Sequence, residues 1–253
     1  MGPDHRASAP DAPGSLCLSR PNTRKPDKPP APGARMKQIT FYLDFISPYA
    51  YLAFEELPVA LMGLSYSVRY KPVFLGGLLK HNAVLGPAEV PPKRNWIYRH
   101  VQWLAQRQGV ELAFPAMHPF NPLGLLRLAI ATQAQGLPNR YVCETLFKHV
   151  WTGGADAADA ARLQAVTAQL APGREPGDDS VKAQLKAHSD EAIAQGVFGV
   201  PSFEVDGKVF WGLDALPMLR AYLEGDAWFA DNDADKRWNA VQAIPSGIPS
   251  RTA

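Results

Sequence analysis

Two segments with strand patterning lie at opposite ends of this chain, and a long stretch of helical periodicity separates them. Residues 38–45 form a run (QITFYLDF) that is almost entirely apolar, aromatic or β-branched, which is typical of a strand covered on both faces. Residues 202–205 and 208–211 form two short strand-like runs around Asp206-Gly207, a dipeptide that favours a type I′ hairpin. The chain therefore needs a fold in which distant segments share one sheet.

The first of these segments continues as a helix and a second strand. Ser47 and Pro48 supply a helix N-cap and a first-turn proline, and apolar residues follow at helical spacing. Residues 66–70 (YSVRY) have the composition of a strand. We expect Gly76-Gly77 to break the chain shortly after it.

From about residue 80 to 195 the apolar residues recur at helical spacing, and no convincing strand pattern is present. The expected helices cover residues 93–108, a segment opened by Asn121-Pro122 and closed by Gly136, and residues 138–151, 157–170 and 180–195. A last helix is expected at residues 213–223, interrupted early by Pro217.

With the helical block removed, the order β-α-β, α, β-β-α is that of a thioredoxin fold. We therefore predict an α/β thioredoxin-like fold with a large all-helical insertion, since an insertion is tolerated where its two ends lie close together. The predicted parts are a disordered Pro-rich arm (1–36), a discontinuous thioredoxin-like domain (37–79 and 196–225), a helical insertion domain (80–195) and a C-terminal tail (226–253).

Charge and cysteine content exclude several function classes. Residues 1–35 hold six Lys/Arg, three Asp/Glu and eight prolines, which leaves 20 basic and 21 acidic residues in the rest of the chain, so the basic excess gives no case for nucleic acid. Met36 is either the true start or follows a genuine tail. The chain has two cysteines, and they lack metal-ligand or CxxC spacing, which argues against a disulfide framework, a zinc site and a dithiol redox centre. The absence of an apolar run long enough for a bilayer or a secretory signal predicts a cytoplasmic location without membrane contact.

Two motifs carry a resemblance to a known family. The run FYLDFISPYAYLA begins at Phe41, and the run GVFGVPSF begins at Gly196 and is followed by VDG and FWGLD. Together they resemble 2-hydroxychromene-2-carboxylate isomerases and kappa-class glutathione transferases, over roughly residues 37–225. The resemblance implies the DsbA-like branch of the thioredoxin superfamily.

Ser47 is the candidate catalytic residue. The two positions that carry C-x-x-C in thioredoxin-type redox enzymes are Ser47 and Ala50 here, so the protein lacks that dithiol. The position still lies at a helix N-terminus, which stabilises an anion. The resemblance implies that a glutathione thiolate binds there, with the Ser47 hydroxyl as a donor; by itself, Ser followed by Pro is more often only a cap.

The resemblance also implies the other glutathione contacts. Pro201 would be cis and Val200 would bind the cysteinyl part through its main chain, although an X-Pro bond is ordinarily trans. Leu213 and Asp214 would bind the γ-glutamyl end, and Asp214 as a simple N-cap is the alternative. Lys93 resembles a family lysine but is equally ordinary as a solvated residue. Asn82 is a weaker candidate, because the corresponding position is occupied by Val84.

Six aromatic residues are candidates for the wall of a second substrate pocket. Trp96 and Trp103 lie seven residues apart on one face of the expected helix, where a core or subunit contact is the commoner explanation. The other candidates are Tyr49, Tyr51, Phe74 and Trp211. The histidines at positions 81, 100, 118 and 149 have no assignable partner, and Cys143 is expected to be a small buried hydrophobe.

By resemblance, the expected function is glutathione-dependent cis-trans isomerisation of 2-hydroxychromene-2-carboxylate or a similar aromatic pyruvate by reversible thiolate addition. The alternatives are a kappa-type transferase or peroxidase, and a redox-inactive thioredoxin-fold module that binds peptides. The expected cofactor is glutathione, the expected partner is a small aromatic molecule, no metal is expected, and a homodimer is the expected assembly.

Overall fold

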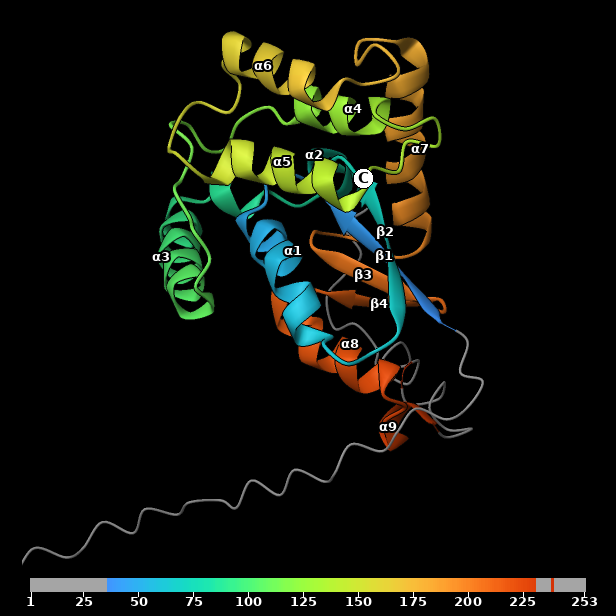
Figure 1. Ribbon diagram of the computed structural model, residues 1–253. Coiled ribbons are helices and arrows are strands. Elements are labelled where there is room, and N and C mark those ends of the chain that lie inside the picture. The colour runs from blue at the N-terminus through green and yellow to red at the C-terminus, as the bar shows by residue number, and fades with distance from the viewer. Residues whose placement is uncertain (1–35, 231–237, 239–253) are drawn as a thin grey trace, which may run out of the picture. The chain divides into compact units, whose positions relative to one another are not determined.

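A mixed four-stranded sheet forms the centre of the fold in a computed structural model that describes residues 36–230 and 238. The strand order is β2 (Tyr66–Pro72), β1 (Lys37–Leu43), β3 (Ser202–Val205) and β4 (Lys208–Trp211) (Figure 1). β1 pairs in parallel with β2 and antiparallel with β3, and β3 pairs antiparallel with β4. The two sequence-distant halves therefore meet between β1 and β3, as the order of elements predicted.

Side chains of β1 are buried on both faces of the sheet. Phe41 and Leu43 belong to the main core, whereas the intervening Tyr42 belongs to a second cluster with Leu78 and Ala192. Because successive strand residues point to opposite faces, the two clusters lie on opposite sides of the sheet. This explains why the buried part of the strand, from Ile39 to Leu43, is almost entirely apolar or aromatic.

The helices cover both sides of the sheet. They are α1 (Pro48–Ala60), α2 (Leu75–His81), α3 (Pro91–Gln108), α4 (Leu123–Ala131), α5 (Arg140–Trp151), α6 (Ala160–Leu170), α7 (Asp179–Ala194), α8 (Leu216–Leu223) and α9 (Ala227–Ala230). Short 3₁₀ turns, η1 (Pro87–Glu89) and η2 (Leu213–Ala215), precede α3 and α8. α1 contacts α3, α5 and α8, while α7 contacts β2 and α2 (Figure 1).

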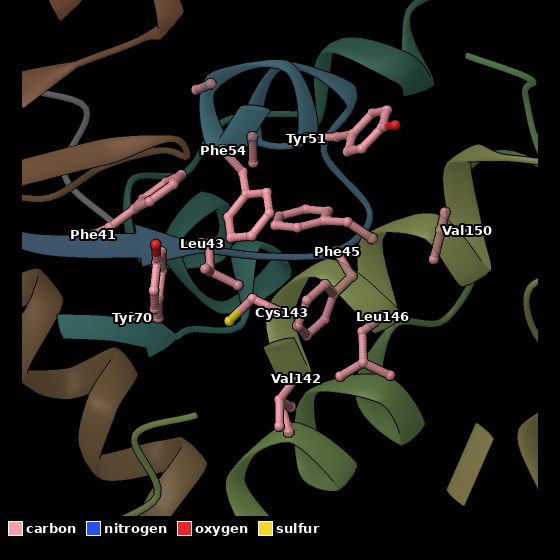
Figure 2. Close-up of a cluster of buried hydrophobic side chains, with 14 of the residues drawn as sticks. Phe41, Leu43, Phe45, Tyr51, Phe54, Tyr70, Val142, Cys143, Leu146 and Val150 are labelled. Carbon is pink, nitrogen blue, oxygen red and sulfur yellow. The ribbon is translucent and has the colours of Figure 1, made fainter. Parts of the chain in front are cut away.

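The main core joins the first strand to the helical block. Figure 2 shows Phe41 and Leu43 of β1 and Phe54 of α1 in one cluster with Cys143 and Leu146 of α5. All five side chains are fully buried. The sheet and the helices between residues 80 and 195 thus share one continuous apolar core, and the proposed boundary at residue 80 stays a prediction.

Local sequence signals placed most elements correctly. The hairpin has the predicted bounds, and its turn residues Asp206 and Gly207 both have positive φ angles of 51° and 78°. α3 ends where predicted, at Gly109, whose φ is 66°. The predicted α/β fold, with a block of helices between the two halves of the sheet, is confirmed.

Three local expectations were wrong or incomplete. Gly76 and Gly77 do not break the chain but lie inside α2, where the ring of Phe74 covers Gly76 so closely that a Cβ would lie 2.6 Å from its Cζ atom. Pro217 does not interrupt the last helix but stands in the first turn of α8, where a proline needs no hydrogen bond. The segment expected to be only a tail contains α9, whose Phe229 packs against the core. The predicted arm lies outside the described residues, apart from Met36.

Candidate functional site

The turn between β1 and α1 places Ser47 at the N-terminus of a helix. Ser47 is the N-cap of α1, with φ −90° and ψ 116°, and its Oγ accepts a hydrogen bond from the Ala50 N–H at 3.2 Å. Its side chain is buried, with 6% of its surface exposed. The capping role predicted for Ser47 is therefore present in the structure.

Val200 and Pro201 lie directly against this turn. The peptide bond between them is cis, and the Ser47 Oγ lies 3.5 Å from the Val200 carbonyl oxygen, to which it donates. Pro201 in turn accepts a hydrogen bond from the Gly212 N–H at 2.9 Å. The two motifs at opposite ends of the sequence thus form one local structure.

Hydrogen bonds with buried side chains stabilise the turn between β1 and α1. The Asp44 carboxylate accepts hydrogen bonds from the Ile46 N–H at 3.2 Å and the Leu75 N–H at 2.9 Å. The Trp151 Nε1–H donates to the Phe45 carbonyl at 2.9 Å. The turn before Ser47 is therefore bonded to the start of α2 through Asp44 and to α5 through the Phe45 carbonyl.

His118 completes this support. Its Nε2 lies 2.8 Å from the Ile46 carbonyl oxygen, and its Nδ1 lies 2.7 Å from the Tyr98 hydroxyl. Burial lowers the pKa of His118, and the hydrogen bond to Ile46 opposes that shift. A neutral imidazole that donates through Nε2 fits this environment.

Burial shifts the pKa of Asp44 in the opposite direction. Desolvation raises its pKa to about 7, and the hydrogen bonds from the Leu75, Ile46 and Phe45 backbones oppose the rise. The charge of this carboxylate therefore changes near neutral pH at the base of the site.

A cavity of about 790 Å³ opens beside the turn, between α1, α3, the end of β4 and α8. This volume lies in the range of small-molecule sites. Seven of the residues expected at the site from the sequence line it: Tyr49, Trp96, Val200, Pro201, Trp211, Leu213 and Asp214. Ser47 itself does not line the cavity, but its hydroxyl contacts Val200, which does.

Two glycines allow close approaches along the same wall. A Cβ at Gly199 would lie 2.8 Å from the Trp211 Nε1, and a Cβ at Gly212 would lie 2.4 Å from an Asp214 carboxylate oxygen. Gly212 also has a φ of 99°, which disfavours other residues. The aromatic ring and the carboxylate can therefore lie directly against the backbone at the cis-proline turn.

Two aromatic residues expected in the pocket lie elsewhere. Tyr51 is 2% exposed in the main core, because it points from α1 toward Phe147, and its hydroxyl donates to the Glu111 carbonyl. Phe74 packs against the same core and covers Gly76. The prediction that these two side chains form part of the pocket wall was therefore wrong.

Trp103, Lys93 and Asn82 are also absent from the cavity lining. Trp103 is 49% exposed and does not line the cavity, although Leu104 and Gln108, further along α3, do. Lys93 is exposed in the first turn of α3. Asn82 ends α2, and its side-chain amide donates to the Leu78 carbonyl at 2.8 Å.

His100 lines the cavity, although no role for it could be predicted from the sequence. It lies on α3 between Trp96 and Trp103, and its Nδ1 is 2.9 Å from the Tyr49 hydroxyl. Spacings of four and three residues along α3 place these rings on one face, which was a usable signal. The cavity also contains Glu56 and Arg220, and Arg220 pairs with Glu224 at 2.7 Å.

The described residues also limit other kinds of chemistry. Positions 47 and 50 hold no thiol, and Cys143 is fully buried in α5, where desolvation raises its pKa. Among residues 36–230 and 238, no helix is both long and apolar enough to cross a bilayer.

The chain is similar in sequence and in fold to known proteins. The chain is 27% identical to a 2-hydroxychromene-2-carboxylate isomerase of Sphingobium xenophagum over 194 residues, which cover 74% of this chain and 98% of that protein. It is 26% identical to glutathione S-transferase kappa 1 of Rattus norvegicus over 217 residues, which cover 78% of this chain and 94% of that protein. A solved 2-hydroxychromene-2-carboxylate isomerase has the same fold, with a TM-score of 0.63 at 20% identity over 83% of this chain and all of the other.

The family model for the DSBA-like thioredoxin domain matches residues 38–224, most of the chain and nearly the whole part described by the structure. The match spans both halves of the sheet and the helices between them. The chain belongs to the DSBA-like thioredoxin domain family.

Proposed function

We propose that this protein is a glutathione-dependent cis-trans isomerase acting on 2-hydroxychromene-2-carboxylate or a similar aromatic pyruvate. The observation that carries the proposal is the contact between Ser47, at a helix N-terminus, and Val200, at a cis-proline turn that borders a cavity. The similarity to isomerases and kappa-class transferases supports it. When bound, glutathione would supply a thiolate that adds to the conjugated double bond of the ring-opened aromatic pyruvate and leaves after rotation about the resulting single bond, so that none is consumed.

The role of Ser47 in this proposal is to stabilise a thiolate. The backbone N–H groups and dipole of α1 favour an anion at this position. The hydroxyl makes only a long hydrogen bond, of 3.5 Å, to the Val200 carbonyl. It can turn away from that carbonyl and donate a charge-assisted hydrogen bond to sulfur. Helix N-termini and neighbouring donors lower thiol pKa values from about 8.5 to about 7.5 or below, which raises the thiolate fraction at neutral pH.

The residues present fit a tripeptide in part. Val200, beside the cis bond, offers main-chain groups to the cysteinyl unit, and Asp214 offers a carboxylate to the γ-glutamyl ammonium group. Leu213 and Asp214 lie in η2, so their N–H groups are available to the γ-glutamyl carboxylate in the proposal. Lys93 and Asn82 lie outside the cavity lining, and we leave them without a role in binding.

Two alternative functions use the same surface. A kappa-type transferase or peroxidase would consume glutathione, and a peptide-binding module would use only the Val200 main chain. A cytoplasmic location, where glutathione is kept reduced, and a homodimeric assembly also remain proposals.

An assay with 2-hydroxychromene-2-carboxylate, with and without glutathione, tests the proposal. We expect the ultraviolet spectrum to change to that of the isomer only when glutathione is present, while total free glutathione stays constant. Stoichiometric loss of glutathione would favour the transferase. Absence of glutathione-stimulated conversion would overturn the proposed function.

A further inference from the structure

The imidazole of His100 is fixed between two tryptophan rings. Its plane lies 14° from that of Trp96 and 19° from that of Trp103, with ring centroids 5.9 and 6.0 Å away. The Arg107 guanidinium lies over the far tryptophan, Trp103, at 4.8 Å from its centroid. This stack along α3 restrains the plane of the imidazole, and the contact between its Nδ1 and the Tyr49 hydroxyl orients the ring within that plane.

The fixed imidazole meets a tyrosine from another helix. Tyr49 is in the first turn of α1, two residues after Ser47, and its hydroxyl lies 2.9 Å from the His100 Nδ1. Both residues line the cavity. The pair therefore joins α1 to α3 in the wall that also contains Val200 and Trp211.

The tyrosine is kept protonated in this position. Burial raises the pKa of Tyr49, and the negative charge of Asp214 raises it further. A phenol that stays protonated is a hydrogen-bond donor. When the His100 Nδ1 carries a hydrogen, the imidazole donates to the phenol oxygen and leaves the phenol hydrogen free to point into the cavity.

The geometry points to Tyr49 as a catalytic hydrogen-bond donor to the ketone oxygen of an aromatic 2-oxo acid, with His100 as the positioning residue that holds the phenol. This inference rests on the proposed function. Attack by a thiolate on the conjugated alkene forms a carbon–sulfur bond and moves the π electron pair toward the ketone oxygen. The same pair returns when that bond breaks, so the step needs no oxidant or reductant, and a donor at the oxygen stabilises the charge that develops there.

Binding of two ligands without glutathione tests the role of Tyr49. Phenylpyruvate carries the ketone oxygen but no conjugated alkene, and 3-phenylpropanoate lacks the ketone. We expect Tyr49→Phe to raise the Kd of phenylpyruvate roughly five- to tenfold, the size of one hydrogen bond, and to leave that of 3-phenylpropanoate unchanged. Calorimetric titration measures both constants, and Tyr141→Phe, at an exposed tyrosine of α5, is the matched control.

Two variants at His100 test the positioning role. His100→Asn places an amide N–H near the former Nδ1 and should keep most of the preference for phenylpyruvate, whereas His100→Leu should lose it as Tyr49→Phe does. The ¹⁵N chemical shifts of His100 in the free protein provide a second readout. We expect them to show hydrogen on Nδ1 in the wild type and to change in Tyr49→Phe.

Several outcomes would overturn this inference. The first is a wild-type protein that binds phenylpyruvate and 3-phenylpropanoate with equal Kd. The second is a Tyr49→Phe variant in which the Kd values of both ligands rise equally. The third is a His100 Nδ1 without hydrogen, together with a His100→Leu variant that keeps the wild-type preference for phenylpyruvate. Because these measurements omit glutathione, they fail independently of the isomerase assay. If the isomerase assay and the binding measurements both give the expected results, the kcat of isomerisation should fall by about 10²-fold in Tyr49→Phe.

Discussion

The hydroxyl of Ser47 and the carbonyl oxygen of Val200 lie 3.5 Å apart, although the two residues are separated by 153 positions in the chain. The contact brings the N-terminus of α1 against the cis-proline turn that precedes β3. The two elements meet beside the cavity, where we propose that glutathione binds.

Replacement of Ser47 by alanine should separate capping from catalysis. The variant loses the cap on the Ala50 N–H and should lose about 1 kcal/mol of unfolding free energy. If the hydroxyl also donates to a thiolate, kcat should fall by about 10²-fold. Asn139→Ala removes a comparable cap, on the Val142 N–H at the start of α5, and should lower stability without lowering kcat. Equal activities of the two variants would remove the hydroxyl from the mechanism.

Asp44→Asn should change how stability depends on pH. The folded pKa of about 7 lies above the ordinary value of 3.8, so the folded state binds more protons than the unfolded state between these values. Asp44 therefore lowers the unfolding free energy of the wild type as pH rises from about 4 to about 7. The unfolding free energy of the wild type minus that of Asp44→Asn should fall by a few kcal/mol over this pH range.

Urea denaturation at a series of pH values measures this difference, and Asp206→Asn is the control. Hydrogen bonds from Lys37 and Tyr222 lower the pKa of Asp206, so its contribution is lost only as pH falls below about 4. The difference between the wild type and Asp206→Asn should then be flat from about pH 5 to 7. A flat profile for Asp44→Asn as well would contradict the assignment of a neutral-range pKa to Asp44.

Trp151→Phe should destabilise the turn that carries Ser47. The substitution removes the indole N–H that donates to the buried Phe45 carbonyl at 2.9 Å, and an unsatisfied buried acceptor costs about 1–3 kcal/mol. Urea denaturation should show that loss of unfolding free energy. Trp228→Phe changes a 40% exposed tryptophan and should stay within about 0.5 kcal/mol of the wild type. A similar small effect at Trp151 would show that the hydrogen bond is unimportant.

The protein should not catalyse thiol–disulfide exchange. The redox positions hold Ser47 and Ala50, and the buried Cys143 has a raised pKa that suppresses its thiolate. Adding the protein should leave the rate of insulin reduction by dithiothreitol unchanged, with thioredoxin as the positive control. Clear turnover would contradict the interpretation of Ser47 as the replacement for a redox cysteine.

Elements set by local chemistry could be predicted from the sequence, and those set by packing could not. The hairpin follows from Asp206-Gly207, and the start of α1 follows from Ser47-Pro48. The effect of Gly76 was misjudged because the Phe74 ring that covers it becomes a neighbour only after folding.

The same distinction holds in the site. Val200 and Asp214 were found through motifs, and the structure places both at the cavity. The pairing of Tyr49 with His100 depends on how α3 packs against α1, which no periodicity within either helix specifies. Tyr51 was misplaced for a related reason, since the sequence does not tell which face of α1 borders the cavity.

The pKa of the thiol of bound glutathione tests the central claim most directly. A pH titration of thiolate ultraviolet absorbance, measured as the difference between the complex and its separate components, gives this value without any aromatic substrate. We expect a pKa of about 7.5 or below for the bound thiol in the wild type, against about 8.5 for an ordinary thiol, and a higher value in Ser47→Ala. A bound thiol that titrates at the ordinary value in the wild type, or glutathione that does not bind, would contradict the proposed role of Ser47 and the α1 N-terminus.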